Sequence, residues 1–166
     1  MRNLITILML ALTLASCNNQ SDPGNMIGSP IEEWKQANPG YEMDAGFEYT
    51  IKRRDIVDGN LVDVEELVWQ NDEGEVILYS IEETGDAEML NKSHENIVNH
   101  YKSIVGEGKT YNDTDDRNKL IRHWFGYVEI DGKLVEYRVV RTLYLKDRRP
   151  TGRATLRYYV VRNCWC

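Results

Sequence analysis

The chain has 166 residues, of which 42% are hydrophobic and 28% are charged, and its formal net charge is −7 at pH 7. This length suits a single domain that can bury a conventional core, and the apolar fraction argues against wholesale disorder. A net acidic chain without a nucleic-acid recognition motif is not expected to bind nucleic acid.

The beginning of the chain has the pattern of a secretory signal. Arg2 precedes an apolar run from Leu4 to Leu14, which is too short to span a bilayer, and small residues follow it. The tetrad Leu14-Ala15-Ser16-Cys17 resembles the lipobox of bacterial lipoproteins. That resemblance implies a signal peptide over residues 1–16, cleavage before Cys17, and acylation of the Cys17 thiol and amino group. The alternative is an ordinary signal peptide with a chance cysteine at the cleavage site.

The next stretch, residues 17–30, is predicted to be the lipidated cysteine and a flexible tether. Asn18 to Pro30 is rich in Asn, Ser, Gly and Pro, as flexible linkers are. Two or more acyl chains hold a protein stably on a membrane, so the lipid on Cys17 would be a firm anchor. Asn18 stands where an Asp would favour inner-membrane retention in sorted lipoproteins. That resemblance implies a place in the outer membrane, facing the periplasm.

Residues 31–166 are predicted to form one α+β domain. A short helix is expected over 29–35 with Ser29 as its cap, and a long one over 86–105 with Asp86 as its cap. Alternating apolar residues and turn signals predict strands over 47–57, 61–70, 75–82, 122–130, 133–146 and 154–162. This βββ-α-βββ order predicts a mainly antiparallel sheet with one principal helix packed on it.

Two strands and one loop carry details that the structure can test. The apolar pattern of strand 61–70 changes phase at Glu65-Glu66, which predicts a β-bulge there. In strand 133–146, Arg141 interrupts the apolar face, so it lies either at an irregularity or in a partly buried position that needs a partner. Residues 111–117 are expected to be a polar loop.

No residue pattern indicates a metal, a cofactor or catalysis. His94 and His100 are six residues apart on a predicted helix and so lie on different faces, which is not the spacing of a metal pair. The acidic loop 112–116 lacks the Gly and the distal Glu of a helix-loop-helix calcium site. Neither a Ser-His-Asp order nor a glycine-rich phosphate loop is readable. We therefore expect a protein that is not an enzyme.

The chain ends in Cys164-Trp165-Cys166, and exported cysteines usually pair. Cα atoms two residues apart in a strand are about 6.6 Å apart, at the upper edge of disulfide geometry. A disulfide between Cys164 and Cys166 would therefore be strained. An intermolecular bridge, a soft-metal site and free thiols are the alternatives.

Charge is distributed unevenly along the mature chain. Residues 17–116 contain 23 acidic and 7 basic side chains, whereas residues 117–166 contain 12 basic and 4 acidic ones. One interpretation is that acidic and basic strands are neighbours in one sheet and pair across it. The other is a basic face that meets an anionic partner, such as a phospholipid headgroup or an acidic protein.

The last strand suggests where a partner could bind. Tyr158 and Tyr159 must point to opposite faces, and Tyr and Arg are enriched at interfaces. The predicted partner-binding residues are Arg138, Arg157, Tyr159 and Arg162. Together these patterns favour a non-catalytic envelope lipoprotein that binds an envelope protein, of which an immunity or inhibitor protein would be one version. The alternatives are a carrier of a small apolar ligand or lipid, with a cavity between helix and sheet, and a hydrolase with scattered residues.

Overall fold

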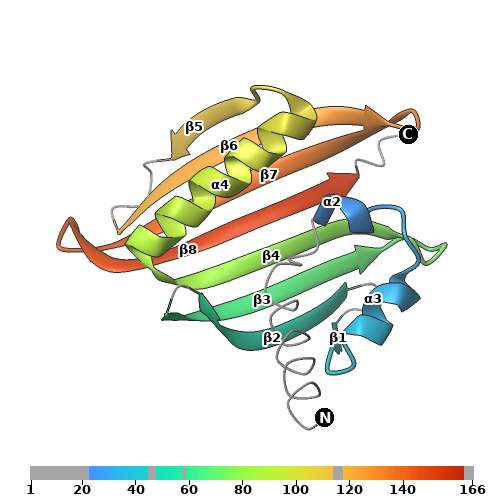
Figure 1. The fold of residues 1–166 in the computed structure, drawn as a ribbon, viewed down its shortest axis with the longest axis horizontal. Coiled ribbons are helices and arrows are strands. Elements are labelled where there is room, and N and C mark those ends of the chain that lie inside the picture. Colours follow the sequence, from blue (N-terminus) through green and yellow to red (C-terminus); the bar gives the residue numbers. More distant parts are fainter. Residues whose placement is uncertain (1–22, 45–47, 58, 114–117, 163–166) are drawn as a thin grey trace, which may run out of the picture.

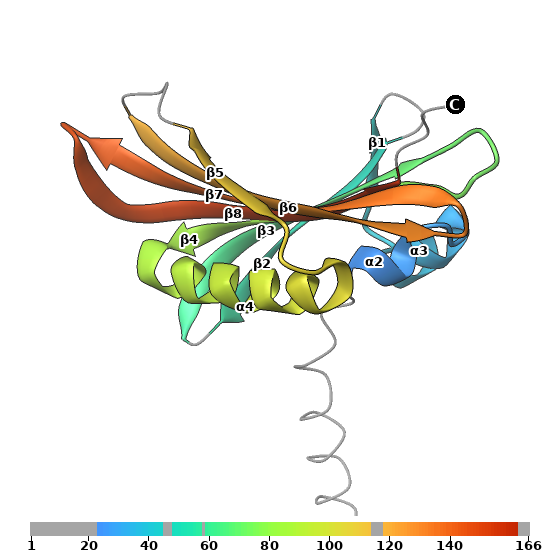
Figure 2. The same ribbon diagram turned by 90° about the horizontal axis from the view of Figure 1, so that it is seen from above.

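The computed structural model describes residues 23–44, 48–57, 59–113 and 118–162. In these residues, eight strands form one antiparallel sheet, and helices lie on one of its faces (Figures 1 and 2). The α+β fold predicted from the sequence is confirmed. The elements are α2 (Pro23–Met26), α3 (Ile31–Ala37), β1 (Glu42–Asp44), β2 (Glu48–Val57), β3 (Asn60–Gln70), β4 (Val76–Asp86), α4 (Ala87–Val105), β5 (Lys109–Asp113), β6 (Lys119–Ile130), β7 (Lys133–Lys146) and β8 (Arg149–Arg162).

The sheet consists of two meanders joined side by side, in the order β1-β2-β3-β4-β8-β7-β6-β5. α4 carries the chain from β4, at the centre, to β5, at the far edge, and the later strands return to the centre (Figure 1). As a result the acidic part of the chain lies beside the basic part. Arg157 pairs with Glu82, and Arg153 lies 3.7 Å from Asp63. Charge pairing across the sheet, the first of the two interpretations above, is confirmed.

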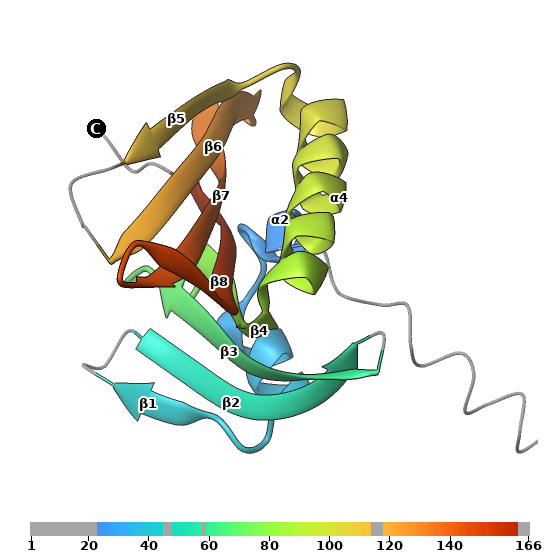
Figure 3. The ribbon, with the colours of Figure 1, turned by 90° about the vertical axis from the view of Figure 1, so that its left-hand side faces the viewer.

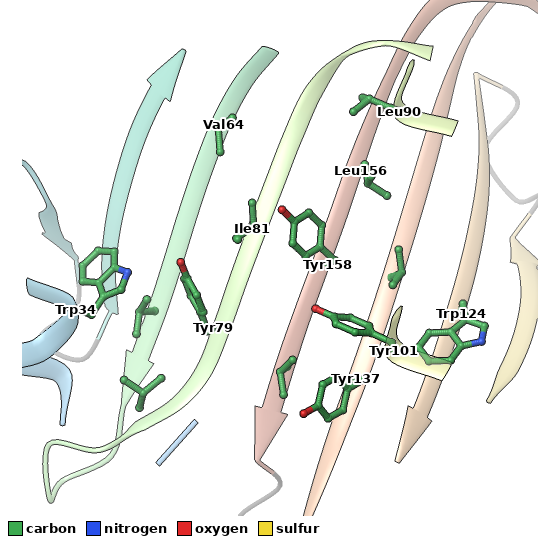
Figure 4. Close-up of a cluster of buried hydrophobic side chains, with 14 of the residues drawn as sticks. Trp34, Val64, Tyr79, Ile81, Leu90, Tyr101, Trp124, Tyr137, Leu156 and Tyr158 are labelled. Atoms are coloured by element: carbon green, nitrogen blue, oxygen red, sulfur yellow. The ribbon is translucent and has the colours of Figure 1, made fainter. Parts of the chain in front are cut away.

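The core lies on the helix-bearing face of the sheet, beneath α4 at one end and beside Trp34 of α3 at the other (Figure 4). Tyr101 of α4 packs edge-on against Tyr137 of β7, with ring centres 4.9 Å apart, and also contacts Trp124 of β6. The largest fully buried side chains are Trp124, Tyr79, Tyr101, Leu90, Leu156, Val62, Val68, Val76, Val139 and Val160. Leu90 and Tyr101 come from α4, and alternation along the strands supplies the other residues to the helix-bearing face.

α4 begins where the sequence predicts. Asp86 is the N-cap, and its carboxylate accepts hydrogen bonds from the backbone N–H groups of Glu88 and Met89, each at 3.0 Å. Of the apolar residues that recur at helical spacing along α4, Leu90 and Tyr101 are buried, whereas Ile104 is 37% exposed.

Replacing Asp86 with alanine should lower the free energy of unfolding by about 1 kcal/mol, because two N–H groups in the first turn of α4 lose their acceptor. Asp86→Asn keeps an acceptor oxygen and should lose much less. Urea unfolding of both variants measures the difference. Equal losses would show that the cap contributes little and that the acidic charge matters instead.

The N-terminal part of the domain differs from the prediction. Residues 23–30, predicted as part of a flexible tether, belong to the folded domain: Gly28 N donates to Val76 O at 2.8 Å, and Val76 N donates to Ser29 O at 2.9 Å. Ser29 does not cap α3. Its hydroxyl donates to Met26 O, and Pro30 is the N-cap residue without a side-chain cap.

The predicted β-bulge at Glu65-Glu66 is wrong. Pairing between β2 and β3 is continuous, and the shift between β3 and β4 lies at Trp69/Gln70. Glu66 keeps its place on the core face because the Tyr79 hydroxyl donates to its carboxylate at 2.6 Å and Arg53 forms an ion pair with it. The apparent phase change arises because Leu67 and Trp69 are apolar residues on the opposite face.

Two further expectations are resolved by strand pairing. Residues 109–113 form the edge strand β5, so the predicted loop over 111–117 is wrong for its first three residues. Pairing is regular around Arg141, which lies opposite Arg122 and is half-buried. Arg141 is therefore the partly buried cation of the two alternatives.

Candidate functional site

The face of the sheet opposite α2, α3 and α4 carries the candidate site, and no described helix covers it (Figure 2). Side chains alternate along a strand, so the neighbours of core residues point to this side. In β8, Leu156 and Tyr158 are buried in the core, whereas Arg157 and Tyr159 point the other way. We call this surface the open face.

Arg138 of β7 is held between aromatic rings on the two neighbouring strands. The pairing places it opposite Phe125 of β6 and Tyr159 of β8. Its guanidinium carbon lies 5.5 Å from the centre of the Phe125 ring and 5.7 Å from that of Tyr159, within cation–π range. Glu136, on the same strand, pairs with the guanidinium at 2.5 Å. Three neighbours thus fix this cation in place.

The protonation states of this group follow from its surroundings. Burial alone would lower the pKa of Arg138, but Tyr159 and Glu136 outweigh burial, and the pKa is raised. Burial also raises the pKa of the Tyr159 hydroxyl. At neutral pH the site therefore presents a permanent cation beside a neutral phenol.

Arg157 lies where the two meanders meet. Its Nε donates to Glu82 Oε2 at 2.6 Å across the β8–β4 pair. Together with Tyr159, these two residues line two adjacent shallow hollows of about 280 Å³ and 380 Å³. The smaller hollow is completed by Glu65, Leu67, Trp69, Leu78 and Ser80, and the larger by Lys119, Ile121, His123, Arg138, Val140, Thr142, Tyr144 and Thr155.

Aromatic rings continue the open face towards the edge of the sheet. Tyr111 of β5 stacks on His123 of β6 with ring centres 4.3 Å apart and an interplanar angle of 5°. Phe125 lies edge-on to Tyr111 and to Tyr127, at 6.0 and 5.8 Å. Tyr111 is 44% exposed and Tyr127 is 42% exposed, so both rings remain available for contact.

His123 is neutral in this setting. Burial, assisted by Arg138, lowers the pKa of its imidazole. The sequence analysis did not single out this histidine. The only local signal was the spacing of His123, Phe125 and Tyr127 at every second position, which places them on one face of a strand.

Three of the four predicted partner-binding residues come together. Arg138, Arg157 and Tyr159 share the open face, but Arg162 does not. Arg162 is four residues after the buried Tyr158, so the same alternation turns it to the helix-bearing face, where its Nη1 lies 3.3 Å from Glu75 Oε2. There it connects the end of β8 to the segment before β4.

The remaining candidates do not form a site in the described residues. Cys17, Cys164 and Cys166 lie outside them, as does part of the acidic loop 112–116. Across residues 23–44, 48–57, 59–113 and 118–162, no cluster of three or more His, Cys, Asp or Glu side chains could hold a metal ion. The carboxylates of Glu66 and Glu83 are buried on the helix-bearing face and accept hydrogen bonds from tyrosine hydroxyls.

The open face can hold a partner by stacking and by ion pairing. Arg138 is held by its neighbours before binding, which reduces the entropy lost when a partner is ordered against it. Comparison of the chain with protein-family models, with curated proteins and with solved structures finds no match.

Proposed function

We propose that this chain is a non-catalytic binding module of the bacterial envelope, anchored by lipid on Cys17, which holds another envelope protein against its open face. The observation that supports this most is the grouping of Arg138, Arg157 and Tyr159 beside two hollows on the sheet face that no described helix covers. Rigid Tyr, Trp and Arg side chains beside hollows are typical of residues that dominate protein–protein binding energy.

The N-terminal sequence supports the anchor and suggests an orientation. α2 begins at Pro23, six residues after Cys17, and six residues span at most about 20 Å. α2 lies on the helix-bearing face, so a tether of this length would hold that face towards the bilayer and leave the open face turned to the periplasm (Figure 2). An outer-membrane location is part of the proposal. None of the helices in the described part of the chain has the length and hydropathy to cross a membrane.

Packing beneath α4 does not favour the carrier alternative. A small apolar ligand would need a cavity between helix and sheet. The side chains that face one another there are large and closed to solvent, with Trp124 at 2% exposure, Tyr101 at 1% and Leu90 at 0%. The hollows on the open face are shallow and partly charged, which suits a protein surface better than a lipid tail.

Site-specific photo-crosslinking in living cells tests the proposal. A benzophenone amino acid at position 140, in the larger hollow, should crosslink the full-length protein to a discrete envelope protein. The same group at position 99, on the exposed side of α4, is the matched control and should give no such product. Arg138→Gln and Tyr159→Ala should reduce the yield from position 140 at least about tenfold, as loss of a binding hot spot does.

Equal yields from positions 140 and 99, or a yield from 140 that survives both substitutions, would contradict binding through the open face. Anchoring is tested separately with Cys17→Ala, which should release the protein from membranes. A Cys17→Ala protein that stays membrane-bound would overturn the anchor but not the binding face.

A further inference from the structure

Two arginines on the helix-bearing face are direct cross-strand neighbours. Arg122 of β6 is paired with Arg141 of β7, and the next core-facing pair along these strands is Trp124 and Val139. Cβ atoms of directly opposite residues are about 4.5–5.5 Å apart, and like charges in such positions are destabilising. A bound anion between the two guanidinium groups would reduce this repulsion.

The described residues do not supply that anion. Neither guanidinium forms an ion pair with a carboxylate in the part of the chain that the structure describes, and Arg141 Nε is buried without a hydrogen-bond partner. Glu95 of α4 acts on Arg141 electrostatically, but burial and Arg122 outweigh it and lower the pKa of Arg141. Glu95 itself accepts a hydrogen bond from Asn91.

Other arginines on the same face show the contrast. Arg53 pairs with Glu66, and Arg162 pairs with Glu75. These two arginines on the helix-bearing face therefore each form an ion pair with a carboxylate. Arg122 and Arg141 are adjacent and have no such match among the residues that the structure describes.

His94 of α4 completes the group. α4 packs over β8, β7 and β6 (Figure 3), and the last two of these strands carry the two arginines on the face that α4 covers. His94 is 5% exposed, and its Nε2 is buried without a hydrogen-bond partner in the described part of the chain. Both arginines act on it electrostatically, together with Glu95. A buried nitrogen and two cations thus converge at one flank of the helix.

We propose that a phosphate-class anion binds at the flank of α4, between Arg122 and Arg141 and beside His94. Guanidinium groups bind phosphate oxygens in a bidentate manner, and two of them can share one tetrahedral anion. Arg122 is exposed and Arg141 is half-buried, so an anion can reach the pair from solvent. The same chemistry is offered by free phosphate and by a phospholipid headgroup. This site is separate from the open face and does not depend on its function.

Thermal unfolding of the full chain in a nonionic detergent, followed by tryptophan fluorescence, tests the proposal. Two probes are titrated at constant ionic strength: inorganic phosphate, and glycerophosphoglycerol, the soluble headgroup of phosphatidylglycerol. At least one of them should raise Tm progressively, as binding to the folded state does. Arg122→Gln and Arg141→Gln should each weaken that binding by roughly tenfold or more. Arg149→Gln, the same charge change at an exposed site, should leave it unaltered.

A second readout does not require a ligand. Without either probe, Arg122→Gln should have a Tm equal to or above that of the parent, since a like-charge contact has been removed. A shift with phosphate would identify a free anion as the source, and a shift with glycerophosphoglycerol alone would identify a lipid headgroup. No shift with either probe, or equal shifts in the parent and in both arginine variants, would overturn the site. A large fall in the Tm of probe-free Arg122→Gln would do the same, because it would show that Arg122 is already stabilised by the protein.

Discussion

Gly108→Ala should lower the free energy of unfolding by roughly 2–5 kcal/mol, from backbone strain and overpacking together. Gly108 lies between α4 and β5 with φ at +64°, a region that residues with a Cβ rarely occupy. A Cβ there would lie 2.6 Å from Trp124 Cζ2 and 2.7 Å from the Phe125 carbonyl oxygen. Trp124 is 2% exposed and its indole N–H donates to Glu107 O at 3.2 Å, so the ring has little freedom to move.

Gly106→Ala is the matched control for this prediction. Gly106 is in the same connection with φ at +82°, but a Cβ there would meet nothing within 4 Å. Its substitution should cost only backbone strain, about 1–3 kcal/mol, because φ of 82° with ψ of −158° is a conformation essentially confined to glycine. Urea unfolding of both variants separates steric overlap from backbone strain. Equal losses would mean that the Trp124 indole can give way and that it does not fix the turn.

The strands that could be predicted are those with one buried face. In β7 and β8, alternation of core residues such as Tyr137, Val139 and Tyr158 was visible along the chain, and the turn at Asp131-Gly132 separated β6 from β7. β5 was missed because all five of its residues are exposed. An edge strand that buries nothing has no periodic signal.

Where both faces of a strand carry apolar residues, the pattern misleads. In β3, Leu67 and Trp69 point to the open face while Glu66 points into the core, which looks like a change of register. Only the partners of Glu66, which come from other strands, explain why a carboxylate can be buried there. Such tertiary compensation cannot be read from a single segment.

The candidate site could be predicted only in part, because some of its contacts depend on which strands are neighbours in the sheet. The enrichment of Tyr and Arg at interfaces indicated Arg138, Arg157 and Tyr159. Side-chain alternation along β8 places Arg162 on the opposite face of the sheet from Arg157 and Tyr159. The stacking of Tyr111 on His123 depends on the β5–β6 pairing, and the contact of Arg157 with Glu82 depends on the adjacency of β4 and β8. Tyr111 and His123 are close in sequence and meet because the exposed strand β5 pairs with β6. Arg157 and Glu82 are 75 residues apart and meet only after α4 has crossed the sheet. These contacts follow from topology, which the strand pattern alone leaves open.

His94 should make the domain sensitive to acid. Burial, followed by the charges of Arg141 and Arg122, lowers the pKa of its imidazole to about 4, and Glu95 opposes this only in part. In the unfolded chain the pKa would be near 6.5. Between these values the unfolded state binds the proton more readily than the folded state, so stability falls as pH falls. The stability that neutral His94 contributes is complete above pH 6.5, decreases from there to about pH 4, and is absent below.

The difference in stability between pH 7 and pH 4 should therefore be about 3 kcal/mol smaller in His94→Gln than in the parent, since glutamine does not titrate. His100→Gln, on the exposed side of the same helix, should retain the full acid sensitivity. Urea unfolding at each pH, in phosphate-free buffers of constant ionic strength, measures the three proteins. Carboxylates titrate in all of them, so only the difference between variants reports on His94. Parallel pH profiles for all three would show that the buried imidazole gains a proton in the folded state at little cost.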